Sequence, residues 1–197
     1  STPKAVKQFM NRIDAMIAQH TACKYLLLDQ LAENQQFLVC GGPGSGKTWL
    51  AFELACRWGG TGNRVLMLAY NLALTGCLKR MVENAECRGL VPAAAIVVKS
   101  WEELAREMFS QSGLPFELPG DVEKHQEFYA DTVPELMAEV AKQDNWPADF
   151  DALVVDEGQD HDTVMERQPS GLDGPGWWGI YLRLLKEGAQ APIAVFF

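Results

Sequence analysis

Two short segments, far apart in the chain, hold the residue types best suited to chemistry. The first is GGPGSGKT at residues 41–48, which follows the apolar run FLVC and has the pattern GxxxxGK[ST]. Its glycines allow backbone N–H groups to turn inward around phosphate oxygens without a clashing Cβ. A helix that follows such a turn also presents its positive N-terminal end. The pattern predicts a phosphate-binding turn, and a glycine-rich strand-to-helix turn without a ligand is the alternative.

Specific roles follow for the residues of this turn. Lys47 is expected to reach the β and γ phosphates of a nucleoside triphosphate, and Thr48 to offer its hydroxyl to Mg²⁺. The predicted ligands are therefore ATP and magnesium. The predicted nucleotide-binding residues are Gly42, Pro43, Gly44, Ser45, Gly46, Lys47 and Thr48.

The second segment is ALVVDEGQD at residues 152–160, where an apolar strand pattern ends in two carboxylates. The carboxyl ends of strands face the ligand crevice in an open α/β sheet. Asp156 is predicted to hold Mg²⁺, directly or through water, and Glu157 to orient or deprotonate an attacking water. With Lys47, these two residues are the catalytic candidates. The alternative is a strand followed by a solvated acidic turn.

Five short apolar runs predict the strands that position these segments, at residues 37–40, 65–69, 95–98, 152–155 and 193–197. They are continuous rather than alternating, as in strands covered on both faces. Helical patterns lie between them, at 46–58 with a stop at Gly59 and Gly60, and at 73–84. The alternation predicts an α/β fold with a parallel sheet flanked by helices. Residues 101–148 predict helices inserted between the third and fourth strands, and 168–179 a loop.

Composition narrows the classes of function. The chain is 48% hydrophobic and has no apolar run near the roughly 18–20 residues of a membrane span, so we expect a cytoplasmic protein without a membrane partner. A net charge of −9 argues against a strongly basic nucleic-acid clamp, although it leaves room for a local groove. No CxxC pair occurs, and buried thiols rather than a metal site or disulfides are expected for Cys23, Cys40, Cys56, Cys77 and Cys87.

Together, GGPGSGKT and VVDEGQD resemble the first two motifs of superfamily 1 helicases of the UvrD/Rep type, whose second motif reads DExQD. The segment VLMLAYNLALTGCLKR at 65–80 is similar to motif Ia of that family, which lies along single-stranded DNA. VVKSWEEL at 97–104 is similar in position to the next element on the DNA side. The nearest resemblance is to nuclease-related-domain helicases, with Schlafen-type P-loop proteins as neighbours.

The resemblance implies a RecA-like P-loop NTPase fold, with residues 1–197 forming the single first motor domain. The implied function is ATP-driven translocation on single-stranded DNA. A second motor domain would supply arginines to the γ-phosphate, so residues 1–197 alone should bind ATP better than they hydrolyse it. Tyr70 and Asn71 would contact nucleic acid, and Gln30 is the candidate for reading adenine.

Several alternatives remain at this point. A regulatory NTP switch that mediates protein interactions is the second functional hypothesis, and RNA is not separated from DNA as a substrate. Tyr70 and Asn71 can equally be a packed aromatic and a turn residue. Trp177 and Trp178 would stack on bases or, more simply, pack the following helix onto the sheet. Trp49 is expected to pack beneath the phosphate-binding turn.

Overall fold

The structure of the protein, a computed structural model, describes residues 26–29, 34–69, 72–113, 115–124, 128, 132–141, 148–158 and 176–197. The chain divides into two compact units, Ser1–Gln35 and Gln36–Phe197, and each is described by itself. Of the first unit, the described residues are a short helical stretch at 26–29 and residues 34 and 35. Everything that follows concerns the second unit.

A parallel sheet forms the centre of this unit. Its five strands among the described residues are β1 (Gln36–Val39), β2 (Val65–Ala69), β3 (Ile96–Ser100), β4 (Ala152–Val155) and β5 (Ile193–Phe196). Their order across the sheet is β1-β5-β4-β2-β3, and every neighbouring pair is parallel. The predicted α/β fold with a parallel sheet is confirmed. Because all strands point the same way, their carboxyl ends lie along one edge of the sheet.

The central strands are those that the apolar runs describe best. Every residue of β2, β4 and β5 is buried, as expected for strands covered on both faces. In the edge strand β1, exposed and half-buried residues alternate, and in the edge strand β3, buried and half-buried residues alternate. β3 was predicted to end at residue 98, yet it continues because Lys99 and Ser100 pair with Leu68 and Ala69 of β2. The sequence did not predict this pairing, because the last two residues of β3 are polar and fall outside the apolar run.

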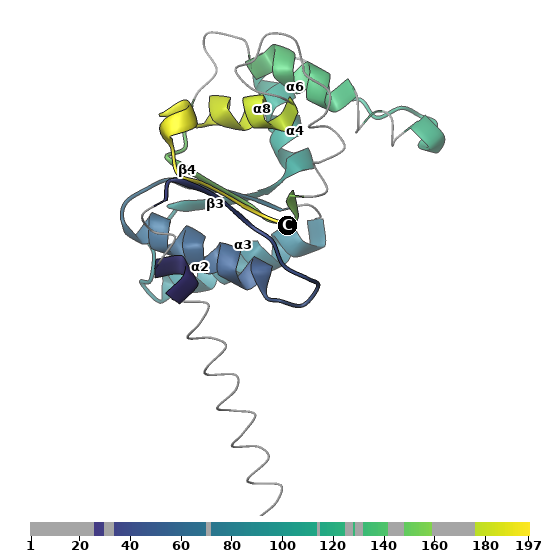
Figure 1. Cartoon of the computed structure of the whole chain (residues 1–197). Helices are drawn as coiled ribbons and strands as arrows, with labels where there is room; N and C mark the ends of the chain where they lie inside the picture. The colour runs from purple at the N-terminus through teal and green to yellow at the C-terminus, as the bar shows by residue number, and fades with distance from the viewer. Residues whose placement is uncertain are drawn as a thin grey trace, which may run out of the picture. The chain divides into compact units, whose positions relative to one another are not determined.

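Helices cover both faces of the sheet (Figure 1). On one face lie α2 (Lys47–Gly60) and α3 (Leu72–Cys87), and on the other α4 (Trp101–Ser112), α6 (Val133–Ala141) and α8 (Gly176–Leu184). The connections β1 to β2 and β2 to β3 cross the sheet in one direction, whereas β3 to β4 and β4 to β5 return. Right-handed crossovers in opposite directions place their helices on opposite faces. The short 3-10 helices are η1 (Val122–Lys124) and η4 (Gly188–Gln190).

Some helix boundaries differ from the sequence expectation. α2 runs through Gly60 rather than stopping at residue 58. Gly59 is a site of close packing rather than a helix end, since a Cβ there would lie 3.1 Å from Ile96 Cγ1 of β3. Residues 176–179 were predicted to be loop but begin α8, whose Ile180, Tyr181 and Leu184 are buried. Residues 168–175 lie outside the described part. α4, η1 and α6 occupy the stretch between β3 and β4 in which inserted helices were predicted.

The expectation of buried thiols is wrong for most of the described cysteines. Cys40, Cys77 and Cys87 are exposed, because Cys40 follows an edge strand and the other two lie on the outer face of α3. Cys56 is half-buried, and burial together with the charge of Glu53 raises the pKa of its thiol to about 11. All four are free thiols, and Cys23 lies outside the described residues. Across the described ranges, no helix combines the length and apolar character needed to cross a membrane.

Candidate functional site

The glycine-rich segment forms the connection from β1 to α2. Within it, Ser45 N donates to Gly42 O at 3.2 Å, and Leu50 N donates to Gly46 O at 3.0 Å to open the helix. Gly44 and Gly46 have φ angles of 73° and 86°, in the left-handed region that glycine adopts without strain. Gly46 stands directly before α2 and has no side chain to accept from the first N–H groups of the helix. Those groups therefore remain available to an anion.

Lys47 folds back over this connection. Its Nζ donates to Gly41 O at 2.7 Å and to Gly42 O at 3.2 Å. The ammonium group is thus held against the same turn of backbone that the sequence predicts to surround phosphate. Backbone carbonyls are neutral partners, so an anionic oxygen would make a stronger hydrogen bond to the same group.

Asp156 comes directly after β4 and is fully buried. Its backbone N donates to Leu68 O at 2.9 Å, and its Oδ1 accepts from Glu157 N at 3.2 Å. Its Oδ2 is also buried but meets no hydrogen-bond donor among the described residues. A buried carboxylate oxygen without a partner is costly, and such exceptions in proteins call for a functional explanation.

The electrostatic environment of Asp156 shows which residues face it. Burial raises the pKa of its carboxyl, and the nearby charge of Glu157 raises it further. A hydrogen bond from the Thr48 side chain and the charge of Lys47 act in the opposite direction. The two segments picked out by their chemistry therefore meet: the Thr48 side chain at the start of α2 bonds to the carboxylate that follows β4, and the charge of Lys47 acts on it from nearby.

These groups fit a magnesium ion as well as a phosphate. Mg²⁺ in proteins takes oxygen ligands, usually one or two protein groups together with substrate phosphates and water. The Thr48 hydroxyl and the free Oδ2 of Asp156 offer two oxygens of this kind next to the phosphate-binding turn. The residues present are therefore suited to a nucleotide carrying Mg²⁺.

The end of β5 joins the two segments, which the sequence did not reveal. Gly41 N donates to Phe197 O at 3.1 Å, and Phe197 N donates to Val39 O at 2.8 Å. On its other side, β5 packs against Gly158, which follows the two carboxylates. Strand order decides this arrangement, and a single sequence does not show strand order. The glycine within DEGQD was the one available signal.

Other predicted residues are placed differently or fall outside the described residues. Trp49 was expected beneath the turn, but its side chain is 50% exposed and its ring lies tilted 5.8 Å from that of Phe52. The first turn of α2 buries Leu50 and Ala51 instead, which directs the preceding residue outward. Trp177 and Trp178 lie within α8. Residues Gln30, Tyr70 and Asn71, together with Gln159 and Asp160, lie outside the described part of the chain.

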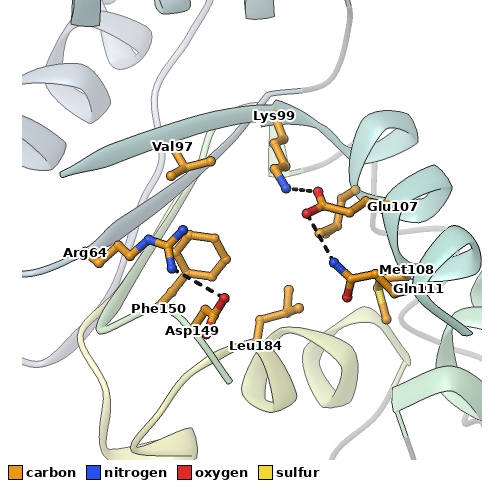
Figure 2. A pocket seen from close by; sticks show the side chains of 10 residues that line it. Arg64, Val97, Lys99, Glu107, Met108, Gln111, Asp149, Phe150 and Leu184 are labelled. Atoms are coloured by element: carbon orange, nitrogen blue, oxygen red, sulfur yellow. Dashed lines mark hydrogen bonds and ion pairs between the residues drawn. The ribbon is translucent and has the colours of Figure 1, made fainter. Parts of the chain in front are cut away.

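A small cavity lies between β3, α4 and the residues that lead into β4, and neither the glycine-rich segment nor Asp156 lines it (Figure 2). Its volume is about 60 Å³, and Met108 and Leu184 form part of its apolar lining. Two ion pairs flank it, Arg64 with Asp149 at 3.4 Å and Lys99 with Glu107. Burial lowers the pKa of Lys99. In contrast to Asp156, the charged side chains here are paired with one another.

Comparison with known proteins adds no relative. A scan against models of protein families finds no match to the chain, and a search of curated proteins finds none either.

Proposed function

We propose that this chain binds Mg·ATP through a P-loop of the RecA-like type and forms the first motor domain of a superfamily 1 DNA helicase. The observation that carries the proposal is the meeting of Thr48 with the buried carboxylate of Asp156. Each segment was selected separately for a role at the same ligand. All turns that follow parallel strands share one edge of the sheet, so the support comes from the closer contact, in which the Thr48 side chain bonds to the buried Asp156 carboxylate.

Each group then has a defined task. The N–H groups of residues 42–48 and the start of α2 bind the phosphates, while Lys47 exchanges its two carbonyl partners for phosphate oxygens. Thr48 and Asp156 hold the metal, which when bound supplies positive charge to the phosphates. Glu157 follows Asp156 directly, and its carboxylate orients the attacking water and accepts its proton.

The motor assignment is supported by the order of the segments along the sheet. β2 lies beside β4, with Leu68 in register with Val155. In the sequence, Tyr70 and Asn71, the proposed nucleic-acid contacts, follow β2, and Asp156 follows β4. These two strands are neighbours in the sheet. The resemblance to motif Ia supplies single-stranded DNA as the substrate.

The test is ATP hydrolysis by the protein with and without single-stranded DNA, and with RNA of the same sequence in parallel. We expect hydrolysis to rise when DNA is added. Glu157→Gln should retain ATP binding while turnover falls by about 10²- to 10⁴-fold, because the water loses its proton acceptor. Tight binding of ATP with no stimulation by either nucleic acid would reject the motor and favour a regulatory nucleotide switch.

A further inference from the structure

Gly158 belongs to the turn of residues 156–158 that follows β4, which we call the acidic turn. At Gly158 this turn contacts the end of β5. A Cβ added to it would lie 2.5 Å from Cγ1 of Val195, closer than real side chains approach, and 3.3 Å from both Phe196 O and Phe197 Cζ. Val195 and Phe196 are buried within the sheet, and Val195 pairs with Leu38 on one side and Val155 on the other. The strand is held on both sides, so a side chain at position 158 would displace the turn.

The residue before Gly158 shows that this turn is under constraint. Glu157 has a φ of 59°, a left-handed conformation that costs a non-glycine residue free energy. Such a conformation persists only where the surroundings enforce it. On one side the backbone N of Asp156 is hydrogen-bonded to Leu68 O, and on the other Gly158 is packed against β5. These two attachments confine the turn and the two carboxylates it carries.

The same stretch of β5 also fixes the other half of the site. Phe197 bonds through its backbone to both Val39 and Gly41, which precede and begin the phosphate-binding turn. The contact path from Gly158 to Phe197 to Gly41 therefore links the acidic turn to the P-loop without passing through a ligand.

We infer that Gly158 is a positioning residue. Because it has no side chain, the acidic turn can pack directly against β5. This packing keeps Asp156 within reach of Thr48 and of a metal bound between them. The inference deepens the proposed Mg·ATP function and rests on it. Because Gly158 acts on the metal-holding carboxylate, its substitution should weaken the magnesium-dependent part of nucleotide binding. Contacts from the P-loop N–H groups and Lys47 to the phosphates should persist.

The experiment measures ATP affinity of the full chain by calorimetry across a magnesium series and in EDTA. Gly158→Ala should weaken Mg·ATP binding by about 10- to 100-fold, the order expected for a shift of about 1 Å, and should raise the magnesium concentration needed for half-maximal binding. Binding in EDTA should stay within about twofold of wild type. Gly120→Ala is the matched control, because a Cβ there meets nothing within 4 Å, and it should change neither quantity.

Rescue separates positioning from a general loss of structure. Val195→Ala removes the atom at 2.5 Å, and the two contacts at 3.3 Å then require shifts of only a few tenths of an ångström. The double variant Gly158→Ala/Val195→Ala should recover the magnesium dependence of Val195→Ala, even if Gly158→Ala alone does not fold. A folded double variant with no recovery, or a Gly158→Ala protein with wild-type magnesium dependence, would overturn the inference. If wild type itself binds no Mg·ATP, the proposed function fails and this inference falls with it.

Discussion

Asp151 and Asp156 lie at opposite ends of β4, and their surroundings are opposite in kind. At the amino end, Oδ2 of Asp151 accepts from Arg64 N at 2.8 Å and its Oδ1 pairs with Lys186 Nζ at 2.8 Å. At the carboxyl end, Asp156 is buried and its Oδ2 meets no donor among the described residues. Both carboxylate oxygens of Asp151 therefore have partners within the fold, whereas one oxygen of Asp156 has none among the described residues.

The pKa shifts of the two groups have opposite signs. The Lys186 ion pair, with the Arg64 N–H, lowers the pKa of Asp151. Burial raises the pKa of Asp156. Asp151 therefore adds stability above its unfolded pKa, and that stability is lost as pH falls through its lower folded pKa. Asp156 does the reverse: stability is lost as pH rises from its unfolded pKa through its higher folded pKa. An aspartate thus stabilises the fold at the amino end of β4. At the carboxyl end, where the function is proposed, an aspartate lowers the stability.

Between the two ends of β4, the largest expected effect comes from Asp156→Asn. Removing a buried charge should raise the free energy of unfolding, by about 1 kcal/mol, because the desolvation cost disappears. Affinity for Mg·ATP should fall by about 100-fold, because one metal ligand is lost. Urea denaturation and calorimetry measure the two quantities. If Asp156→Asn were less stable than wild type and its ATP binding still depended on magnesium, the distinction between the two ends of β4 would be wrong.

Asp151→Asn is the matched variant at the other end of the strand. It removes the charge that pairs with Lys186 while keeping an oxygen for the Arg64 N–H. Because this pair is partly exposed, the free energy of unfolding should fall by only about 0.5–1 kcal/mol. Mg·ATP affinity should remain unchanged in the same calorimetric assay. A loss of nucleotide binding here would mean that the two ends of β4 are not functionally separate.

The pH dependence of stability sharpens the comparison. At pH 7, Asp156→Asn should be more stable than wild type and Asp151→Asn less stable. The Asp156→Asn difference should vanish once pH falls below the ordinary aspartate pKa of about 3.9, because the raised pKa of Asp156 leaves its carboxyl protonated there in both states. The Asp151→Asn difference should persist to lower pH and vanish only below the lowered folded pKa of Asp151. Denaturation curves at several pH values for the three proteins test this. Parallel curves, with constant differences at every pH, would contradict the assigned shifts.

The smallest expected effect is the coupling between Asp151 and Lys186. A double-mutant cycle with Asp151→Asn and Lys186→Met should give a coupling free energy of about 0.5 kcal/mol, the usual size for a partly exposed pair. High salt should reduce it. A coupling near zero would assign the lowered pKa of Asp151 to the Arg64 N–H instead.

GGPGSGKT and VVDEGQD were selected from the sequence because few residue types can surround phosphate or hold magnesium. The structure brings Thr48 of the first segment to Asp156 of the second, while their roles toward phosphate and magnesium stay predictions. The buried strands β2, β4 and β5 were also predicted, since continuous apolar runs report burial on both faces. The order of the strands in the sheet could not be predicted, because hydrophobic periodicity indicates which residues are buried and not which strands are neighbours.

Two features that depend on that order were missed, and a third was missed for a separate reason. The Phe197 bonds to Val39 and Gly41 exist because β5 lies beside β1. Gly158 packs closely against β5 because β5 also lies beside β4. The exposure of Cys77 follows from which side of α3 faces the sheet, and an apolar residue type alone does not specify this.

The central claim is that residues 41–48 and Asp156 form one site for Mg·ATP, and calorimetry of wild type against Lys47→Ala tests it most directly. Wild type should bind one Mg·ATP per chain, more weakly in EDTA. Lys47→Ala should lose at least about 100-fold in affinity, because it removes the cation that faces the phosphates. Equal binding by the two proteins, or no binding by wild type with any magnesium-loaded nucleoside triphosphate, would contradict the account.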